Sequence, residues 1–370
     1  MLKTYTDSVI DYKTNRVFWL DVARTIAITM VVLNHATEHI YKLNINFFEH
    51  LSFSSKIFAH MAFTTGRLGV PIFLFLTGYL LLGKYYSERD CQLFWKKKWA
   101  NLILTTQLWI LIYNFFFVFT RKGFSFNSID VLKELLFFMQ VPMGHMWYMP
   151  MIIGIYLFLP IFSRALYKLD VSVLRFPLIV IGIYLTITPI FNILSGEKLY
   201  TRLDFGYSGG LYGFCILLGF LIRRGGINLN KISLCIGTIL SFLVTVYLQF
   251  ISYKNGVTYN VWYNCGSLLI CSLGIFKCIS YLDGAELYSS CFSSDIINFF
   301  VEKISIVSFS IYFIHYPIML MIENMVKNLK IMLPIKVLIL WSVTFLLSVI
   351  VVQICYKSEF LRKRLLYIHS

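Results

Sequence analysis

Charged residues are scarce in this sequence, and long hydrophobic runs are abundant. Of its 370 residues, 14% are charged and 58% are hydrophobic, whereas roughly one quarter of the residues of a soluble domain are charged. The hydrophobic residues gather in runs of about 20, the length that a helix needs to cross a bilayer. These runs lack the alternation of a transmembrane β-strand. The sequence therefore argues against a soluble domain and predicts an all-α, polytopic membrane helical bundle.

Signatures of several other classes are missing. The chain has no glycine-rich phosphate loop of the GxxxxGK[ST] type and no HExxH zinc motif. Its eight cysteines form no CxxC pair and no cluster with histidine, so we expect no metal site. A run of intramembrane carboxylates, as in a proton relay, is also lacking. The few intramembrane charges are more often Arg and His than Asp and Glu, which favours anionic ligands and acid–base chemistry over cation transport.

Ten runs are long enough to be transmembrane spans, and the connections between them are short. We therefore predict one membrane domain over residues 1–370, with short tails at 1–16 and 356–370. The first run shows no signal-peptide cleavage site, so we expect it to be a span. The second run is long, and a break near Pro71 is expected. The predicted spans are 17–36, 57–83, 100–120, 146–163, 176–194, 207–222, 232–252, 259–282, 304–325 and 333–355.

The formal net charge of +15 comes from Lys and Arg between the spans. Because these residues form no single basic domain or stripe, we expect no nucleic-acid partner. With a cytoplasmic amino terminus, the inner loops and tails hold close to twice as many Lys and Arg as the outer loops. The 84–99 loop and the carboxyl-terminal tail contribute most clearly. The pattern predicts a multi-pass protein of the cell membrane with both termini in the cytoplasm.

The first span contains three ionisable residues, Asp21, Arg24 and His35, which lipid disfavours unless they are paired or face a wet cavity. Eleven residues at about 100° each bring Arg24 and His35 to within about 20° of one helix face, roughly 16 Å apart along the axis. One groove could therefore contact both. In the alternative interpretation, Asp21 and Arg24 pair and anchor the helix, and His35 is only an interhelical hydrogen-bonding group.

Arg67 lies alone in the second span, between Gly66 and Gly69. A buried guanidinium needs an anionic or carbonyl partner. The glycines permit close backbone approach at a functional kink, although a plain small-residue packing seam explains them equally well.

Two later segments add histidines beside aromatic residues. His145 precedes Trp147 and Tyr148 at the outer edge of the fourth span, where Trp and Tyr are commonly interfacial. His315 follows Tyr312 inside the ninth span, and a simple helix-bonding role is an equal alternative to a site role.

Together these segments resemble the acyltransferase-3 family of bacterial membrane enzymes, which O-acylate surface polysaccharides and related glycans. WLDVARTIAITMVVLNHA is similar to the family's first-helix signature, an arginine and then, eleven residues on, a histidine. GRLGVPIFLFLTGYLL, GHMWYMPMIIGIYLFLPI and SFSIYFIHYPI resemble later helices of the family in the same order. The resemblance covers nearly the whole chain.

The chain departs from the family pattern in two places. Arginines spaced three apart often follow the second helix of the family, whereas this chain has Lys97 and Lys98, and Asn101 in place of a second arginine. Some members also carry a hydrolase-like domain after the membrane part. This chain ends soon after its last span, so we expect it to act alone or to pass its product to a separate protein.

The resemblance implies transfer of an acyl group, with acetyl-CoA as the expected donor, to a sugar hydroxyl of a lipid-linked or cell-surface glycan. His35 would be the general base or a transient acyl carrier, Arg67 would stabilise the oxyanion, and Arg24 would hold the donor. The alternatives are a carrier or flippase for a glycan or acyl donor, and a polymerase that uses polyprenyl-linked sugars. The full set of expected site residues is His35, Arg24, Arg67 and Asp21 for catalysis; Lys96, Lys97, Lys98 and Thr77 for the donor; and His145, Trp147, Tyr148, Tyr312, His315 and Glu38 for the acceptor or for support.

Overall fold

The computed structural model describes residues 17–42, 45–121, 126–197, 199–254, 261–282 and 295–367. These residues form helices and connections, with no β-strand among them, so the predicted all-α fold is confirmed. The longer helices are α1 Phe18–Tyr41, α3 Phe53–Arg67, α4 Gly69–Leu81, α6 Ala100–Thr120, α8 Tyr148–Leu166, α9 Ser172–Ser195, α10 Gly210–Arg223, α11 Lys231–Lys254, α12 Gly266–Ser280, α14 Asp295–Lys327 and α15 Leu333–Tyr356. The shorter helices are α2 Ile45–Glu49, α5 Glu88–Phe94, α7 Ser128–Leu135 and α16 Glu359–Arg364.

Seven helical stretches of the described chain are long and apolar enough to cross a membrane, and α10 and α12 are shorter apolar helices. The seven stretches match seven of the ten predicted spans, and α1, α10 and α12 match the other three. The chain is therefore a multi-pass helical membrane protein. The predicted tail 1–16 lies outside the described residues.

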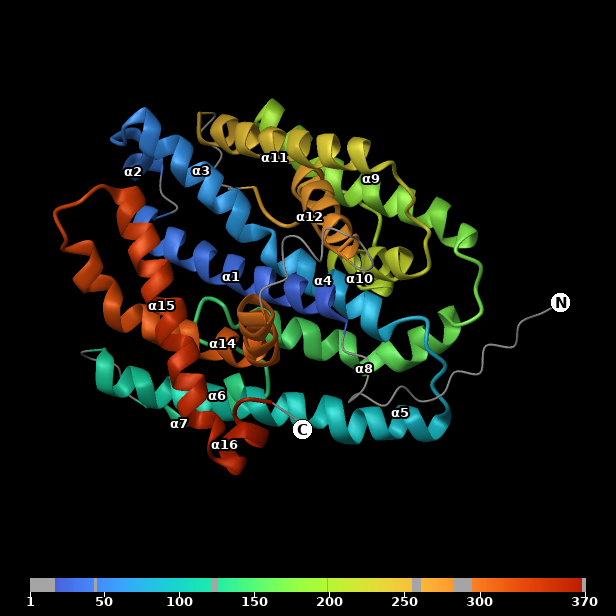
Figure 1. Cartoon of the computed structure of the whole chain (residues 1–370), viewed down its shortest axis with the longest axis horizontal. Helices are drawn as coiled ribbons and strands as arrows, with labels where there is room; N and C mark the ends of the chain where they lie inside the picture. Colours follow the sequence, from blue (N-terminus) through green and yellow to red (C-terminus); the bar gives the residue numbers. More distant parts are fainter. Residues whose placement is uncertain are drawn as a thin grey trace.

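Helix α1 occupies the centre of the bundle (Figure 1) and packs against α3, α4, α12, α14 and α15. Two glycines allow its closest contacts. A Cβ atom at Gly66 would lie 2.6 Å from the Cα of Asn34, and one at Gly69 would lie 2.5 Å from the carbonyl oxygen of Ala27. The small-residue seam is thus real, and it brings Arg67, next to Gly66, to the level of His35 on α1.

The break in the second span lies at Leu68, between α3 and α4, three residues before Pro71. Pro71 sits in the first turn of α4, where backbone N–H groups have no intrahelical acceptor and the missing N–H costs little. The helix is therefore interrupted between Gly66 and Gly69 and not at the proline.

The predicted 84–99 loop is largely helical. Ser87 and Asp90 form a capping box that starts α5, and a π-helical turn at Trp95–Trp99 joins α5 to α6. The third span is therefore continuous from Glu88 to Thr120. Sequence reasoning missed this extension because the three adjacent lysines on the turn have the polarity of a loop.

Helix α7 runs back along α6 (Figure 1). Asn114 on α6 donates to the Glu134 carboxylate at 2.7 Å, and Gln107, two turns earlier on α6, donates to the Leu135 carbonyl at 3.2 Å. The segment that follows α7 begins on the surface, where Leu136, Phe138 and Met139 are exposed, and then enters the bundle. It carries His145, three residues before the start of α8, to a buried position with 1% of its surface exposed.

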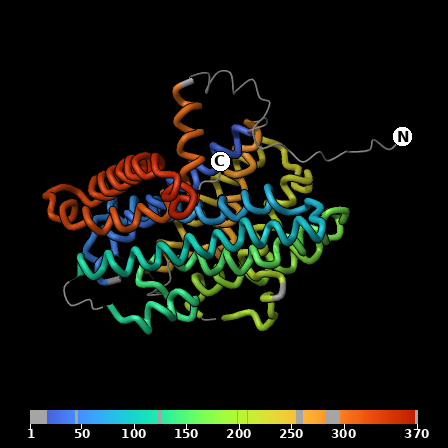
Figure 2. The backbone as a smooth tube through the Cα atoms, turned by 90° about the horizontal axis from the view of Figure 1, so that it is seen from below, coloured from blue at the N-terminus to red at the C-terminus, as the bar shows by residue number. Residues whose placement is uncertain are grey.

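Helix α14 does not follow one straight line. In Figure 2 its first turns stand upright from the rest of the bundle, and the remainder continues beside α1 and α15. The contact between Thr25 and the Val301 carbonyl, at 3.1 Å, fixes the start of the part that packs on α1. His315 lies further along this packed part.

Candidate active site

His35 on α1 forms a pair with Glu38 one turn later. The Nδ1 atom of His35 lies 2.9 Å from Glu38 Oε2, and Asn34 Nδ2 donates to Glu38 Oε1, also at 2.9 Å. A carboxylate can only accept, so Nδ1 carries the proton, and in the neutral imidazole Nε2 of His35 keeps its lone pair. Glu38, a predicted supporting residue, therefore fixes the tautomer that a general base needs.

Arg67 at the end of α3 has no exposed surface. Its Nη1 atom donates to the Val261 carbonyl at 2.9 Å, and its guanidinium lies 4.9 Å from the Phe63 ring centroid and 4.7 Å from that of Trp262. Among the described residues, its Nε and Nη2 atoms have no hydrogen-bond partner. Arg67 thus has the carbonyl partner that the sequence required, and it retains N–H donors for an anionic oxygen.

Three histidines from distant parts of the chain meet beside Arg67. The ring centroid of His35 lies 5.4 Å from that of His315 and 6.3 Å from that of His145, and the last two are 5.2 Å apart. Tyr316 contacts both His35 and His145, with centroid distances of 5.3 and 4.8 Å. The fold therefore assembles His145 and His315 with His35, as one site.

Hydrogen bonds also fix the tautomers of the other two imidazoles. His315 Nδ1 lies 3.0 Å from the Ile311 carbonyl, so it must donate. Tyr113 donates to the Phe313 carbonyl at 2.8 Å, which leaves its oxygen to accept from His145 Nε2 at 3.3 Å. Within the described chain, Nε2 of His315 and Nδ1 of His145 have no partner. The cluster therefore presents unpaired imidazole lone pairs in a buried site.

A small cavity of about 20 Å³ lies against His35. Tyr312, which lines it, also donates from its hydroxyl to the His145 carbonyl at 2.5 Å. Arg67 lies beside the cavity, within electrostatic range of Glu38 and Tyr263. The lining residues are Val31, Asn34, His35, Gly66, Val70, His145, Trp147, Tyr148, Tyr263 and Tyr312. We call this space the histidine pocket.

The model of the acyltransferase-3 family, described as an acyltransferase domain, matches residues 17–357. The chain belongs to the acyltransferase-3 family. No match was found among curated proteins or among solved structures. The histidine pocket is accordingly the candidate active site of a membrane acyltransferase.

The residues predicted to bind the donor do not line the pocket. Arg24 and Asp21 form an ion pair at 3.1 Å, and Ser305 donates to the same Asp21 oxygen at 2.6 Å. Asp21 is buried, whereas the Arg24 side chain is 31% exposed. The pairing considered as the alternative is therefore present, and Asp21 holds Arg24 in place without lining the histidine pocket.

Arg24 and His35 each lie near one tyrosine of α8. Arg24 lies within electrostatic range of Tyr156 on that helix, and His35 lines the pocket together with Tyr148, eight residues earlier on α8. The spacing of Arg24 and His35 along α1 is thus matched by two tyrosines on α8. Thr77, another predicted donor residue, is buried and donates to the Phe73 carbonyl at 3.0 Å.

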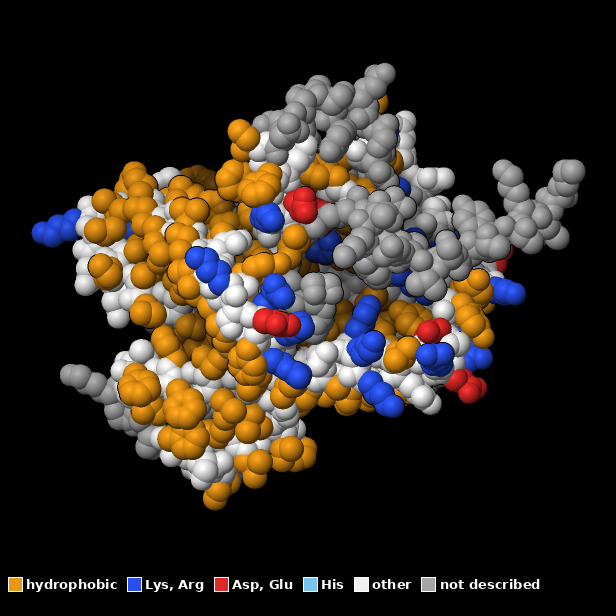
Figure 3. All heavy atoms as spheres, turned by 60° about the horizontal axis from the view of Figure 1, so that its bottom comes forward, with side chains coloured by type: hydrophobic (Ala, Val, Ile, Leu, Met, Phe, Trp, Pro, Cys, Tyr) orange, Lys and Arg blue, Asp and Glu red, His pale blue; other side chains and the backbone are white. Residues whose placement is uncertain are grey.

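Lys96, Lys97 and Lys98 lie exposed on the π-helical turn. Figure 3 shows Lys and Arg side chains gathered near the middle of one face of the acyltransferase, with broad hydrophobic areas beside them. None of the three lysines lines the histidine pocket.

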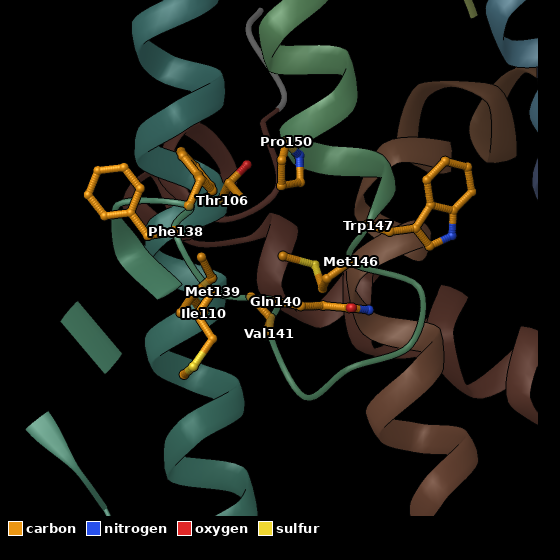
Figure 4. Close-up of a pocket in the computed structure, with 10 residues that line it drawn as sticks. Thr106, Ile110, Phe138, Met139, Gln140, Val141, Met146, Trp147 and Pro150 are labelled. Atoms are coloured by element: carbon orange, nitrogen blue, oxygen red, sulfur yellow. The ribbon is translucent and has the colours of Figure 1, made fainter. Parts of the chain in front are cut away.

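A second cavity, of about 270 Å³, lies behind the segment that carries His145 (Figure 4). Thr106 and Ile110 of α6 form one wall, and Pro150 of α8 lies opposite. Met146 points into this space, whereas the ring of Trp147 points away from it (Figure 4) and packs against Tyr263 at a centroid distance of 5.7 Å. The chain at 145–147 therefore separates the second cavity from the histidine pocket.

Sequence reasoning missed several residues of the site. Asn34 lies next to His35 and four residues before Glu38, a helical spacing that could have identified it. Tyr113 lies within an apolar run, and Trp262 follows a connection between spans, so no pattern marked either one. Tyr316 directly follows His315 and could have been grouped with it.

Proposed function

We propose that this acyltransferase moves an acetyl group from cytoplasmic acetyl-CoA to a sugar hydroxyl of a cell-surface or lipid-linked glycan. The observation that carries the proposal is the His35–Glu38 pair, which faces a pocket near the unpaired N–H groups of Arg67. A general base and an oxyanion donor are the two groups that acyl transfer to a hydroxyl needs.

In this mechanism His35 Nε2 accepts the proton of the sugar hydroxyl as its oxygen attacks the thioester carbonyl. The Glu38 carboxylate stabilises the imidazolium through Nδ1–H. When the tetrahedral intermediate collapses, the C–S bond breaks and His35 returns the proton to the sulfur of coenzyme A. No further acid or base is needed, because His35 both removes the proton and returns it.

Arg67 stabilises the negative charge that develops on the carbonyl oxygen. One N–H group is already used on the Val261 carbonyl, and this bond anchors the guanidinium. Its remaining donors are held in a site that excludes water, where a hydrogen bond to an oxyanion is worth more than in solution.

Arg24 would bind the anionic coenzyme toward the other end of α1. Lys96, Lys97 and Lys98 would add positive charge for its phosphate groups. Eleven residues of helix separate Arg24 from His35 by roughly 16 Å. The long pantetheine arm would cover this distance along the face of α1 that carries both residues.

The proposal is tested by incubating membranes that contain the protein with acetyl-CoA labelled in the acetyl group. We expect label in glycan that mild alkali releases, because O-acyl esters are cleaved by alkali and N-acyl groups resist it. A carrier or a glycan polymerase would leave the glycan unlabelled, and alkali-stable label would refute O-acylation.

A further inference from the structure

The carboxyl-terminal segment is fastened into the bundle. After α16 the chain turns inward, and three consecutive carbonyls accept hydrogen bonds from side chains of other helices. Thr105 donates to Arg364 at 2.9 Å and Trp109 donates to Leu365 at 2.9 Å. Ser310 on α14 donates to the Leu366 carbonyl at 2.8 Å. This segment was expected to be a tail, and it is instead part of the wall between α6 and α14.

Tyr367 brings the same segment to the donor end of the protein. Its hydroxyl donates to the Lys98 carbonyl at 3.0 Å, and its ring packs on Phe309 with a centroid distance of 5.1 Å. Tyr156 on α8 lies within electrostatic range of both Tyr367 and Arg24. The end of the chain, the lysine turn and Arg24 therefore surround one region.

Helix α16 adds positive charge to this region. Arg364 is exposed. Arg362 lies 5.3 Å from the Tyr356 ring centroid, and its Nε atom has no hydrogen-bond partner among the described residues. Lys363 is balanced by Glu359, with Nζ and Oε1 2.5 Å apart. Arg362 also lies within electrostatic range of Glu359. Arg364 remains exposed, and the bond from Tyr367 to the Lys98 carbonyl joins this segment to the π-helical turn.

We infer that Arg362 and Arg364 of α16 bind the phosphate groups of the acyl-CoA donor, together with Lys96, Lys97 and Lys98. Arginine suits this task because its planar guanidinium donates two parallel hydrogen bonds to a phosphate, while lysines add unspecific charge. The hydrogen bonds to residues 364–367 hold the arginines in position before the ligand arrives, which lowers the entropic cost of binding. This inference rests on the proposed function, since that function supplies the donor.

The first experiment measures binding of coenzyme A to the purified protein in lipid vesicles. Arg364→Ala should raise the Kd by about tenfold, because one charge-assisted hydrogen bond is lost. Arg364→Lys, which keeps the charge, should recover part of the affinity. Lys168→Ala, which removes an exposed charge between α8 and α9, is the matched control and should bind as the wild type does. Equal affinity of Arg364→Ala and wild type would overturn the inference.

The second experiment compares two donors. Acetyl-CoA carries the phosphates, and the acetyl thioester of N-acetylcysteamine lacks them. Arg364→Ala should raise KM for acetyl-CoA by about tenfold and leave the kinetics with the short thioester unchanged. Equal losses with both donors would show that α16 is only structural, and an effect that vanishes in vesicles without anionic lipid would assign the arginines to lipid headgroups. Wild-type protein that binds coenzyme A yet transfers no acetyl group would refute the proposed function and leave the binding result standing.

Discussion

The two ends of α1 are built differently. Around Arg24 the side chains are partly exposed, charged and paired, as with Asp21 at 3.1 Å. Around His35 the groups are buried and aromatic, and several polar atoms of Arg67, His145 and His315 have no partner in the described chain. Buried polar atoms are usually satisfied, because an unsatisfied one costs about 1–3 kcal/mol.

The difference suggests a division of labour along one helix. Exposed, paired charges capture an anionic ligand and release it again, so changes there should alter KM. Buried donors and lone pairs without a partner can bind groups that appear only during the reaction, so changes there should alter kcat. The predictions below follow from this division, from the largest expected effect to the smallest.

His35→Ala should lower kcat by about 10²–10⁴-fold, because it removes the general base. Acetyl transfer by purified protein in vesicles measures the effect. His50→Ala is the matched control, since His50 is an exposed histidine outside the pocket, and it should retain full activity. A fully active His35→Ala protein would show that His35 is not the general base and that the histidine pocket is not the active site.

Arg67→Lys should lower kcat by about 10²–10³-fold while KM for acetyl-CoA changes little, because lysine cannot bond the Val261 carbonyl and an oxyanion in the same planar geometry. Thermal unfolding of the same variant tests whether it stays folded. If KM rose and kcat held, Arg67 would belong to ligand capture instead.

Glu38→Gln should reduce kcat between about 10- and 100-fold, since the amide keeps the shape but cannot stabilise an imidazolium. The loss should be smaller than that of His35→Ala. Glu49→Gln, an exposed position on α2, is the control. A loss as large as that of His35→Ala would give Glu38 a role beyond positioning.

Arg24→Ala should raise KM for acetyl-CoA by about tenfold and leave kcat near the wild-type value, as expected for loss of one phosphate contact. Steady-state kinetics over a range of acetyl-CoA concentrations measures both. A fall in kcat with unchanged KM would contradict the assignment of this end to the donor.

Glu134→Gln tests the helix that carries the chain back toward the pocket. Burial raises the pKa of Glu134, and the hydrogen bond from Asn114 opposes the shift in part. A raised pKa in the folded state favours the protonated form, so this stabilisation is present below the unfolded pKa and is lost as pH rises through the folded one. The midpoint of thermal unfolding should therefore fall less between pH 4 and pH 7 in Glu134→Gln than in wild type. An identical pH dependence of the two proteins would contradict a raised pKa of the Glu134 carboxyl in the folded state.

Composition and periodicity were enough for the helical fold and for most span positions, because hydrophobic length is a direct requirement of the bilayer. They failed where polar residues fold into the protein. The lysines at 96–98 continue a helix, and Glu134 lies on a helix that packs back along α6. No local sequence pattern marks the helical turn at 96–98 or the position of α7, because contacts with distant helices stabilise both.

The sequence predicted the residues of the candidate site one by one, as isolated polar residues within hydrophobic spans. His35, Arg67, His145 and His315 each stood out because lipid disfavours them. The sequence could not show that three of these rings lie within about 6 Å of one another, because α1, α14 and the chain before α8 meet only in the folded bundle. Tyr113 was missed for the same reason, since its hydroxyl is polar only in a place that the fold creates.

The most direct test compares the rate of a single turnover at saturating acetyl-CoA in Arg24→Ala and His35→Ala. Saturation compensates for weak donor binding, so the account predicts that Arg24→Ala reacts at nearly the wild-type rate, whereas His35→Ala, which still binds coenzyme A, does not react. A slow Arg24→Ala protein beside a fully active His35→Ala protein would contradict the division of α1 into a donor end and a catalytic end.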